Sequence, residues 1–270
     1  MPNGELASLP TVGRVESRDG DVAKRALDVI VSVAGLLILS PVLLLCGLLI
    51  WLEDRHHPLY MAPRVGRGGE SFRMVKFRSM VVNADRTGVD STAGDDRRIT
   101  RMGRIIRGLK LDEVSQLWNV ARGDMSLVGP RPNVERDVRL YTPAERGLLS
   151  VRPGITDFAS IVFADEGEIL RGATDPDLRY NQIIRPWKSR MGLHYVSVRG
   201  SALDVRLIAA TLLNGFSRRR ALNWVAAMLR ETGADAQLAD VALRNRPLEA
   251  APPPGASDVV RSRNPASPSA

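Results

Sequence analysis

The amino-acid sequence predicts an α+β fold, mostly helical, in which a membrane-embedded helical segment precedes a compact domain. Three observations lead to this prediction. Residues 26–52 form a long apolar run with a proline near its middle. Residues 60–80 contain two short extended stretches around three closely spaced glycines, a pattern typical of a β-hairpin. From residue 99 onward, apolar side chains recur three to four positions apart, as on one face of a helix.

The composition limits the kinds of partner that the chain can have. The 270 residues carry a formal net charge of +8, which fits nucleic acid, anionic lipid headgroups or a nucleotide. We expect no nucleic-acid partner, because aromatic residues make up only 5% and are not interleaved with basic ones. Cys46 is the single cysteine, and His56, His57 and His194 lack the spacing of a zinc site.

The apolar run of residues 26–52 is about 40 Å long as a straight helix. It therefore exceeds the roughly 20 residues that a bilayer-crossing helix needs. Ser40 and Pro41 divide it into limbs of about 14 and 11 residues, because proline removes a helical hydrogen-bond donor. Neither limb spans a hydrocarbon core of about 30 Å. The run is then either a kinked transmembrane helix or a re-entrant helix-break-helix.

The charges beside the apolar run favour the re-entrant form. Lys24 and Arg25 precede the run. Six further cations follow it before residue 80: Arg55, Arg64, Arg67, Arg73, Lys76 and Arg78. Positive flanks mark the cytoplasmic side of a membrane segment. Because both flanks are positive, we expect the segment to enter and leave on the cytoplasmic face.

The sequence divides into five predicted parts. Residues 1–23 are rich in Gly, Pro and Ser and predict a mobile N-terminal tail, and residues 24–54 form the re-entrant membrane segment. Residues 55–216 form the compact domain, with a small β-hairpin and interfacial helices. Residues 217–243 predict an amphipathic C-terminal helix, which either lies on anionic lipid or packs on the domain. Residues 244–270 are dominated by Pro, Ala, Ser and Arg and predict a disordered tail.

The densest polar motifs lie between residues 76 and 132, and they contain the adjacent acids Asp112 and Glu113. Neighbouring helical residues point about 100° apart, so these acids do not form a facing carboxylate pair. They can divide the work instead: one attacks a phosphorus atom while the other holds a hard cation such as Mg²⁺. The alternative is local and structural, because acids are favoured at the start of a helix.

Phosphoryl transfer requires positive charge around the transferred group. Eight cations in the same region are candidates: Lys76, Arg78, Arg97, Arg98, Arg104, Arg107, Lys110 and Arg131. For any one of them taken alone, a solvated, lipid-facing basic surface is the better explanation. Arg131 differs, because the prolines on both sides restrict its backbone and so favour a phosphate contact.

A series of ordered motifs between Lys24 and Leu213 carries a resemblance to a known family. The motifs are Lys24-Arg25 with Asp28, Ser40-Pro41, Arg64-Val65-Gly66, Lys76-Phe77-Arg78-Ser79-Met80, Asp96 with Arg98-Ile99-Thr100, Gly103-Arg104, Leu111-Asp112-Glu113, Gln116-Leu117-Trp118-Asn119-Val120, the stretch 123–132 and Pro153-Gly154-Ile155-Thr156. Through them the chain resembles the bacterial sugar transferases, the monotopic phosphoglycosyl transferases that start glycan assembly on undecaprenyl phosphate. It resembles the minimal form of this family.

The resemblance implies a re-entrant helix broken at Ser40-Pro41 and a catalytic domain on the cytoplasmic face of the bacterial inner membrane. It implies that Asp112 attacks the β-phosphate of a UDP-sugar and that Glu113 binds Mg²⁺. Substrate-binding roles would fall to four cations: Lys76, Arg78, Arg98 and Arg131.

The partners that the resemblance implies are a UDP-sugar, undecaprenyl phosphate and the lipid bilayer, with a homodimer as one option. A catalytically silent scaffold of a glycan-assembly complex is the alternative function. Three places depart from the family pattern. Ala62-Pro63 precede Arg64-Val65-Gly66 where the family often has a glutamine. Ser115 stands where a proline is frequent, and residues 157–160 replace a stretch that bears on the sugar, so the transferred sugar stays open.

Overall fold

The computed structural model describes residues 20–84, 92 and 94–262. The helices are α1 (Gly20–Asp54), α2 (Arg101–Gly108), α3 (Leu111–Val114), α4 (Leu117–Arg122), α5 (Glu135–Arg139), α6 (Phe158–Val162), α7 (Glu166–Ile169), α8 (Pro176–Ile183), α9 (Arg185–Val198), α10 (Ser201–Phe216), α11 (Arg218–Glu231) and α12 (Ala236–Leu243), with 3-10 turns η1 (Arg67–Gly69) and η3 (Glu145–Ser150). The strands are β1 (Leu59–Val65), β2 (Ser71–Phe77), β3 (Ser126–Val128) and β4 (Gly154–Thr156).

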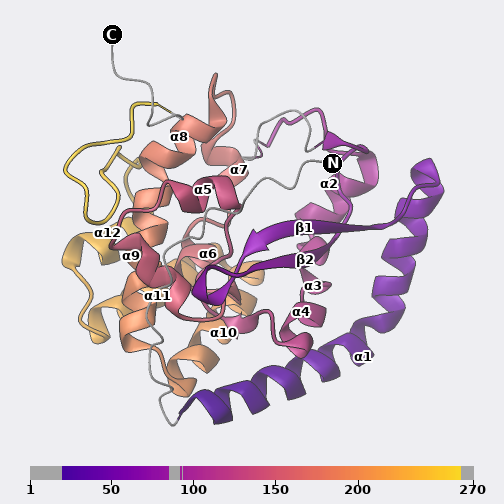
Figure 1. The fold of residues 1–270 in the computed structure, drawn as a ribbon, viewed down its shortest axis with the longest axis horizontal. Coiled ribbons are helices and arrows are strands. Elements are labelled where there is room, and N and C mark those ends of the chain that lie inside the picture. Colours follow the sequence, from indigo (N-terminus) through magenta and orange to yellow (C-terminus); the bar gives the residue numbers. More distant parts are fainter. Residues whose placement is uncertain (1–19, 85–91, 93, 263–270) are drawn as a thin grey trace.

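The described part of the chain is mostly helical with two small sheets, as the sequence predicts. Strands β1 and β2 form the expected antiparallel hairpin, with Leu59 opposite Phe77 and Val65 opposite Ser71. Strands β3 and β4 form a short parallel pair. Figure 1 shows the hairpin in the centre of the molecule, with α3 and α4 between it and α1, and most of the later helices on the opposite side.

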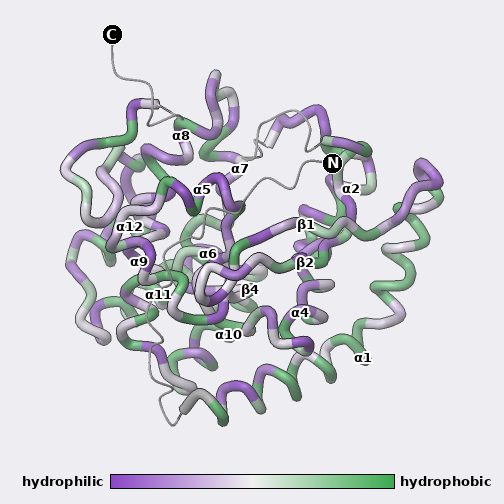
Figure 2. Tube along the Cα trace, in the orientation of Figure 1, coloured by the Kyte–Doolittle hydropathy of each residue, from purple (hydrophilic) through white to green (hydrophobic). Residues whose placement is uncertain are grey.

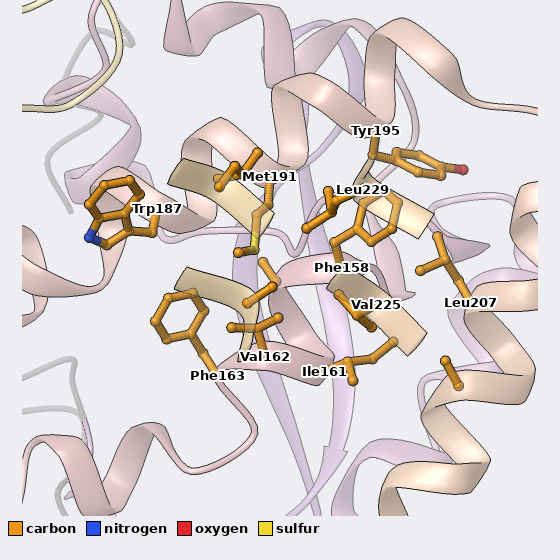
Figure 3. Close-up of a cluster of buried hydrophobic side chains, with 14 of the residues drawn as sticks. Phe158, Ile161, Val162, Phe163, Trp187, Met191, Tyr195, Leu207, Val225 and Leu229 are labelled. Atoms are coloured by element: carbon orange, nitrogen blue, oxygen red, sulfur yellow. The ribbon is translucent and has the colours of Figure 1, made fainter. Parts of the chain in front are cut away.

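The largest core lies among α6, α9, α10 and α11, where Phe158, Met191 and Leu207 are fully buried (Figure 3). Helix α11 contributes one face to it: Ala221, Leu222, Val225, Ala226, Met228 and Leu229. Of the two interpretations for the C-terminal helix, the structure therefore has the packed one. The predicted single helix over 217–243 is two helices, because the chain turns at Gly233, whose φ of 77° favours glycine.

Helix α1 is continuous through Ser40 and Pro41, so the predicted break of the helix at these residues is wrong for the backbone. Proline at position 41 cannot donate to the Leu37 carbonyl oxygen four residues earlier. The Ser40 hydroxyl donates to that oxygen instead, at 2.8 Å. This replacement bond lets the helix pass the proline, and Figure 1 shows α1 bending along its length rather than ending.

Helix α1 exposes an apolar surface. Residues Val22–Asp54 are long and apolar enough, by length and composition alone, to cross a membrane. Leu44 and Ile38 are each 75% exposed, although burying one such side chain contributes about 1.5–3 kcal/mol. Figure 2 shows the hydrophobic residues along α1 and the hydrophilic ones towards its ends. These observations are consistent with membrane association, which is the expectation for residues 24–54.

The N-terminal boundary of α1 differs slightly from the prediction. Helix α1 begins at Gly20, so the last residues of the predicted tail 1–23 are helical, and residues 1–19 lie outside the described part of the chain.

The prediction of a disordered tail over 244–270 is wrong for residues 244–262, while residues 263–270 lie outside the described part. The backbone N–H of Ala251 donates to the Gln182 carbonyl oxygen at 3.0 Å, and the Gln182 amide donates to the Val260 carbonyl oxygen at 2.9 Å. Arg190 donates to the Pro252 carbonyl oxygen at 2.9 Å. The segment is held by its backbone groups, which its proline-rich composition does not reveal.

Strand β2 is fixed to the helices beside it by two buried polar side chains. Asn119 on α4 accepts from Val75 N at 2.8 Å and donates to the Arg73 carbonyl oxygen at 2.8 Å, as a neighbouring strand would. The Ser115 hydroxyl lies 3.2 Å from the Val75 carbonyl oxygen. These contacts satisfy backbone groups of β2 that no strand covers, and they fix the position of Lys76 beside α3.

Strands β3 and β4 approach closely because glycines stand where their ends meet. A Cβ on Gly154 would lie 2.1 Å from Gly129 N, and a Cβ on Gly129 would lie 2.5 Å from the Arg152 carbonyl oxygen. Gly154 N donates to the Pro130 carbonyl oxygen at 3.0 Å. The parallel pair therefore fixes the backbone directly before Arg131.

The contacts of Asn119 predict a large stability effect. Asn119→Ala leaves Val75 N and the Arg73 carbonyl oxygen buried without partners, which costs about 3 kcal/mol of unfolding free energy. Chemical denaturation in detergent measures it. Asn245→Ala, at an exposed asparagine bonded to Arg219, is the matched control and should change stability by about 0.5 kcal/mol or less. Equal effects of the two variants would contradict this role of Asn119.

Candidate active site

Asp112 lies on the four-residue helix α3 and is 8% exposed. The residue before this helix, Lys110, has a left-handed backbone with φ of 57°, a conformation that costs a non-glycine residue of order 1 kcal/mol. Asp112 lies in the first turn of α3, where the helix dipole favours an acid, so this placement agrees with the structural alternative as well as with a catalytic role. Its Oδ1 atom is buried without a hydrogen-bond partner among the described residues. A buried, unpartnered carboxylate oxygen is a candidate for contact with a ligand.

Glu113, the next residue on α3, forms an ion pair with Arg131 from the loop after β3. Burial acts to raise the pKa of Glu113. The positive charges of Arg131 and Lys76 and the hydrogen bond from Arg131 outweigh it and lower the pKa to about 2. Glu113 is therefore ionised throughout the physiological range. The pair also places the guanidinium of Arg131 next to the acids of α3.

Lys76, on β2, lies among the same charges. Burial and the positive charge of Arg131 lower the pKa of Lys76 to about 8, and the charges of Glu113 and Asp112 oppose this shift. Lys76 is therefore mostly protonated at neutral pH and loses its charge under mildly alkaline conditions. A lysine that titrates in this range is typical of functional sites, although structural networks also produce such shifts.

The pKa of Asp112 lies above its usual value of 3.8 because of burial and the negative charge of Glu113. Lys76, Arg107 and Arg131 act in the opposite direction. The two acids of α3 thus differ strongly in their surroundings. Glu113 is neutralised by a direct partner, whereas Asp112 is held near cations without bonding to one through Oδ1. Such a difference in surroundings allows two neighbouring carboxylates to serve different chemical tasks.

The structure brings together four of the six residues that the sequence predicts for the site, namely Asp112, Glu113, Lys76 and Arg131. The other two are engaged elsewhere. Arg78 binds Asp54 at the end of α1 through two bonds of 2.5 and 2.6 Å. Arg98 binds Asp96, with a closest distance of 2.7 Å. Ser40 and Pro41 lie within α1.

A pocket that is open to solvent, with about 420 Å³ of empty space, lies beside Arg131. Its lining includes Asn133, Tyr141, Asp157, Ser160, Tyr180 and Lys188. Asp157 is 1% exposed, and burial raises the pKa of its carboxyl group. Its Oδ1 atom accepts from the backbone N–H and the hydroxyl of Ser160, both at 2.7 Å.

Sequence reasoning did not identify most of this pocket. Lys188 forms an ion pair with Glu166, and the charges of both residues act on the groups around Arg131. They lie more than 30 residues from Arg131 along the chain, within no recognisable motif. The sequence drew attention to Asp157 only because residues 157–160 depart from the family pattern. Arg107 and Lys110, in contrast, were among the eight candidate cations, and their charges act on Asp112 and Glu113 respectively.

The carboxylates of α3 suit a hard divalent cation. Among the described residues, no group of three or more His, Cys, Asp and Glu side chains gathers at one point, so an all-protein metal cage is not present there. Mg²⁺ commonly takes one or two carboxylates and completes its shell with water and substrate phosphates. Glu113, ionised, and the unpartnered Oδ1 of Asp112 provide such a set.

Comparison with known proteins places the chain in a family. The family model described as bacterial sugar transferase matches residues 20–218. A UDP-glucose:undecaprenyl-phosphate glucose-1-phosphate transferase of Caulobacter vibrioides is 35% identical over 194 residues, which are 69% of this chain and 73% of the relative. The exopolysaccharide production protein PSS of Rhizobium leguminosarum bv. phaseoli is 36% identical, over 73% of this chain and 96% of the relative.

A longer relative is the UDP-N-acetylgalactosamine-undecaprenyl-phosphate N-acetylgalactosaminephosphotransferase of Aeromonas hydrophila. It is 33% identical over 208 residues, which cover 73% of this chain but only 45% of the relative. The family match contains Lys76, Asp112, Glu113 and Arg131 and extends over well more than half of the chain. The chain therefore belongs to the bacterial sugar transferase family.

Proposed function

We propose that the chain transfers a sugar-1-phosphate from a UDP-sugar to undecaprenyl phosphate and releases UMP. This reaction would be the first membrane step in the assembly of an exopolysaccharide or another glycan. The observation that carries the proposal is Asp112, a buried carboxylate with an unpartnered oxygen among the charges of Lys76, Arg107 and Arg131. The activities for which the Caulobacter and Aeromonas relatives are named supply the class of donor and acceptor.

In the proposed first step, the Asp112 carboxylate attacks the β-phosphorus of the UDP-sugar. A bond forms between a carboxylate oxygen and this phosphorus, and the bond from the phosphorus to the bridging oxygen breaks. UMP leaves with that bond's electron pair, and the phosphosugar stays on Asp112 as an acyl phosphate. Arg131 and protonated Lys76 offset the negative charge that develops on the phosphate oxygens.

In the proposed second step, a phosphate oxygen of undecaprenyl phosphate attacks the same phosphorus. The bond to Asp112 breaks, and the carboxylate is restored while the lipid carries the phosphosugar through a diphosphate. Leu109 precedes α3 in the sequence and Trp118 follows it, and their exposed fractions are 65% and 56%. These apolar side chains suit a lipid-facing entrance for the acceptor.

Mg²⁺ fits the proposal as a cofactor that Glu113 would hold, with the unpartnered Oδ1 of Asp112 as a further candidate ligand. When bound there, it would neutralise charge on the phosphate oxygens and on the departing UMP. Arg131, the ion-pair partner of Glu113, keeps this carboxylate ionised and in place for the cation.

We also propose that α1 is re-entrant and that the domain faces the cytoplasm at the bacterial inner membrane. The cations at both ends of the apolar run support this topology, as do the proline inside α1 and the bending of this helix along its length (Figure 1). The exposed apolar surface of α1 supports its insertion in lipid. A spanning helix would place its two ends on opposite faces, which labelling of both termini of the segment distinguishes.

The first test of the proposed function uses the purified protein in detergent with Mg²⁺, undecaprenyl phosphate and a panel of UDP-sugars. Asp112→Asn should lower the rate of UMP release at least about a thousandfold, because an amide is a poor nucleophile. The matched control is Asp240→Asn, at an exposed aspartate near Arg230, and should keep the full rate. An active Asp112→Asn variant would sink the proposed mechanism.

The second test is the pH dependence of kcat/KM for UMP release. The rate should fall on the acid side as Asp112 becomes protonated, at a pH above its usual pKa of 3.8. It should fall again on the alkaline side near the pKa of Lys76, about 8, because charge on the phosphates is then no longer offset. Lys76→Arg, which stays charged, should move the alkaline fall to higher pH. An alkaline fall unchanged by this variant would refute the role of Lys76.

A further inference from the structure

A second pocket, open to solvent and with about 390 Å³ of empty space, lies at the N-terminal end of α1. Its lining consists of Lys24, Arg25, Asp28, Arg67, Ser126, Val128, Val151, Arg152, Tyr195 and Arg199. None of these residues belongs to the candidate active site. Val128 borders this pocket, whereas Pro130 and Arg131, two and three residues later, border the pocket beside Arg131 described above.

One wall of this pocket is a hydrogen-bonded network that joins α1 to the domain. The Lys24 ammonium donates to Asp204 Oδ2 at 2.5 Å, to the Val128 carbonyl oxygen at 3.0 Å and to the Tyr195 hydroxyl at 3.1 Å. The Tyr195 hydroxyl lies 2.7 Å from Asp204 Oδ1. All three N–H donors of Lys24 are thus used within the protein, and its charge is matched by Asp204.

The rest of the lining is strongly basic. Arg25, Arg67, Arg152 and Arg199 border the pocket, and Asp28 is the one acid in the lining. Arg25 donates to the carbonyl oxygens that end α4, and Arg152 donates to the Gly123 carbonyl oxygen at 3.0 Å. The buried Asp28 accepts from Leu127 N at 3.0 Å. Four guanidinium groups around one pocket create a positive potential that favours an anion.

A buried hydroxyl adds a second, independent indication of a ligand. Ser126 lines the pocket and is 1% exposed, and its Oγ atom has no hydrogen-bond partner among the described residues. An unpartnered buried hydroxyl costs about 1–3 kcal/mol, so such groups normally bond to a ligand or to water. An anionic oxygen in the pocket would accept a bond from Ser126.

The pocket also lies at the polar end of the apolar helix. Lys24, Arg25 and Asp28 are on the first turns of α1, and the exposed apolar residues follow at once, beginning with Ile30, which is 66% exposed. If α1 lies in lipid, this end of the helix lies at the level of the headgroups. Basic side chains at that level are attracted to anionic lipids.

We propose that this pocket binds a phosphate group, either that of an anionic lipid headgroup or free phosphate. Arginine is the side chain best suited to phosphate, because its fork of N–H donors matches two phosphate oxygens at once. The Ser126 hydroxyl donates to another oxygen of the same group. A bound headgroup would fix the first turns of α1 against the domain at the membrane surface. This site does not depend on the chemistry assigned to Asp112.

The test uses the full chain in neutral detergent with EDTA and without sugar nucleotide. Arginines are modified with phenylglyoxal, and mass spectrometry of peptides measures the modification of Arg67, Arg152 and Arg199. Inorganic phosphate is titrated in one arm, phosphatidylglycerol in a second and phosphatidylcholine in a third. Protection by phosphatidylglycerol alone identifies a lipid headgroup, and protection by inorganic phosphate identifies a free anion. Absence of protection in every arm overturns the proposal, as does equal protection of exposed Arg139 on α5.

Variants distinguish a built site from general basic charge. Arg67→Gln and Ser126→Ala should each raise the ligand concentration for half-protection of Arg152 and Arg199, about tenfold for the arginine and less for the serine. Arg139→Gln removes the same charge from an exposed position, and it should leave that concentration unchanged. An equal effect of Arg67→Gln and Arg139→Gln would mean that only net charge matters and would contradict the proposed site.

Discussion

Two acids, Asp112 and Glu113, and two cations, Lys76 and Arg131, lie together in one poorly solvated site. The packing around this site has to keep the four charges in place. Burying a single ionised group in a protein costs several kcal/mol unless partners compensate it. Asp112 and Glu113 repel each other, and so do Lys76 and Arg131, but each acid is stabilised by the cations. Removing any one of the four therefore shifts the pKa values of the others, and the cluster is electrostatically coupled.

Three separate segments have to meet to form this cluster, and each is fixed by a different device. Asn119 takes the place of a missing neighbour strand beside β2 and so positions Lys76. The crossing of Gly129 and Gly154 fixes the loop that carries Arg131. The left-handed backbone of Lys110 turns the chain into α3, whose first turn presents both acids. The first two devices rely on a buried polar side chain and on glycine, and the third relies on the left-handed backbone of an exposed lysine.

The predictable part of the structure was the part with local signals. The glycines after β1 indicated the hairpin, and the adjacent acids with Arg131 between two prolines indicated the cluster. Apart from Arg131, the residue pattern did not rank the eight candidate cations, since an ion pair such as Arg78 with Asp54 forms only in the folded chain. Lys188 gave no signal for the same reason, because its place near Arg131 depends on the packing of α9.

Two predictions failed because a polar side chain or the backbone compensated for a sequence signal. Pro41 indicated a break, but the Ser40 hydroxyl restores the bond to the Leu37 carbonyl oxygen, and the helix bends instead. The proline-rich C-terminal segment indicated disorder, but residues 244–262 are tied to α8 and α9 through carbonyl oxygens and the N–H of Ala251. Composition describes side chains and cannot report such backbone contacts.

The most direct test of the account is to look for the phosphosugar on Asp112 before any acceptor lipid is added. The protein would be mixed with Mg²⁺ and its productive UDP-sugar, quenched, digested and examined by mass spectrometry, while UMP is counted in parallel. The account predicts one burst of UMP, up to one per protein, and a matching mass increase on the peptide that contains Asp112. UMP that appears only when undecaprenyl phosphate is present, with no modified peptide, would contradict it.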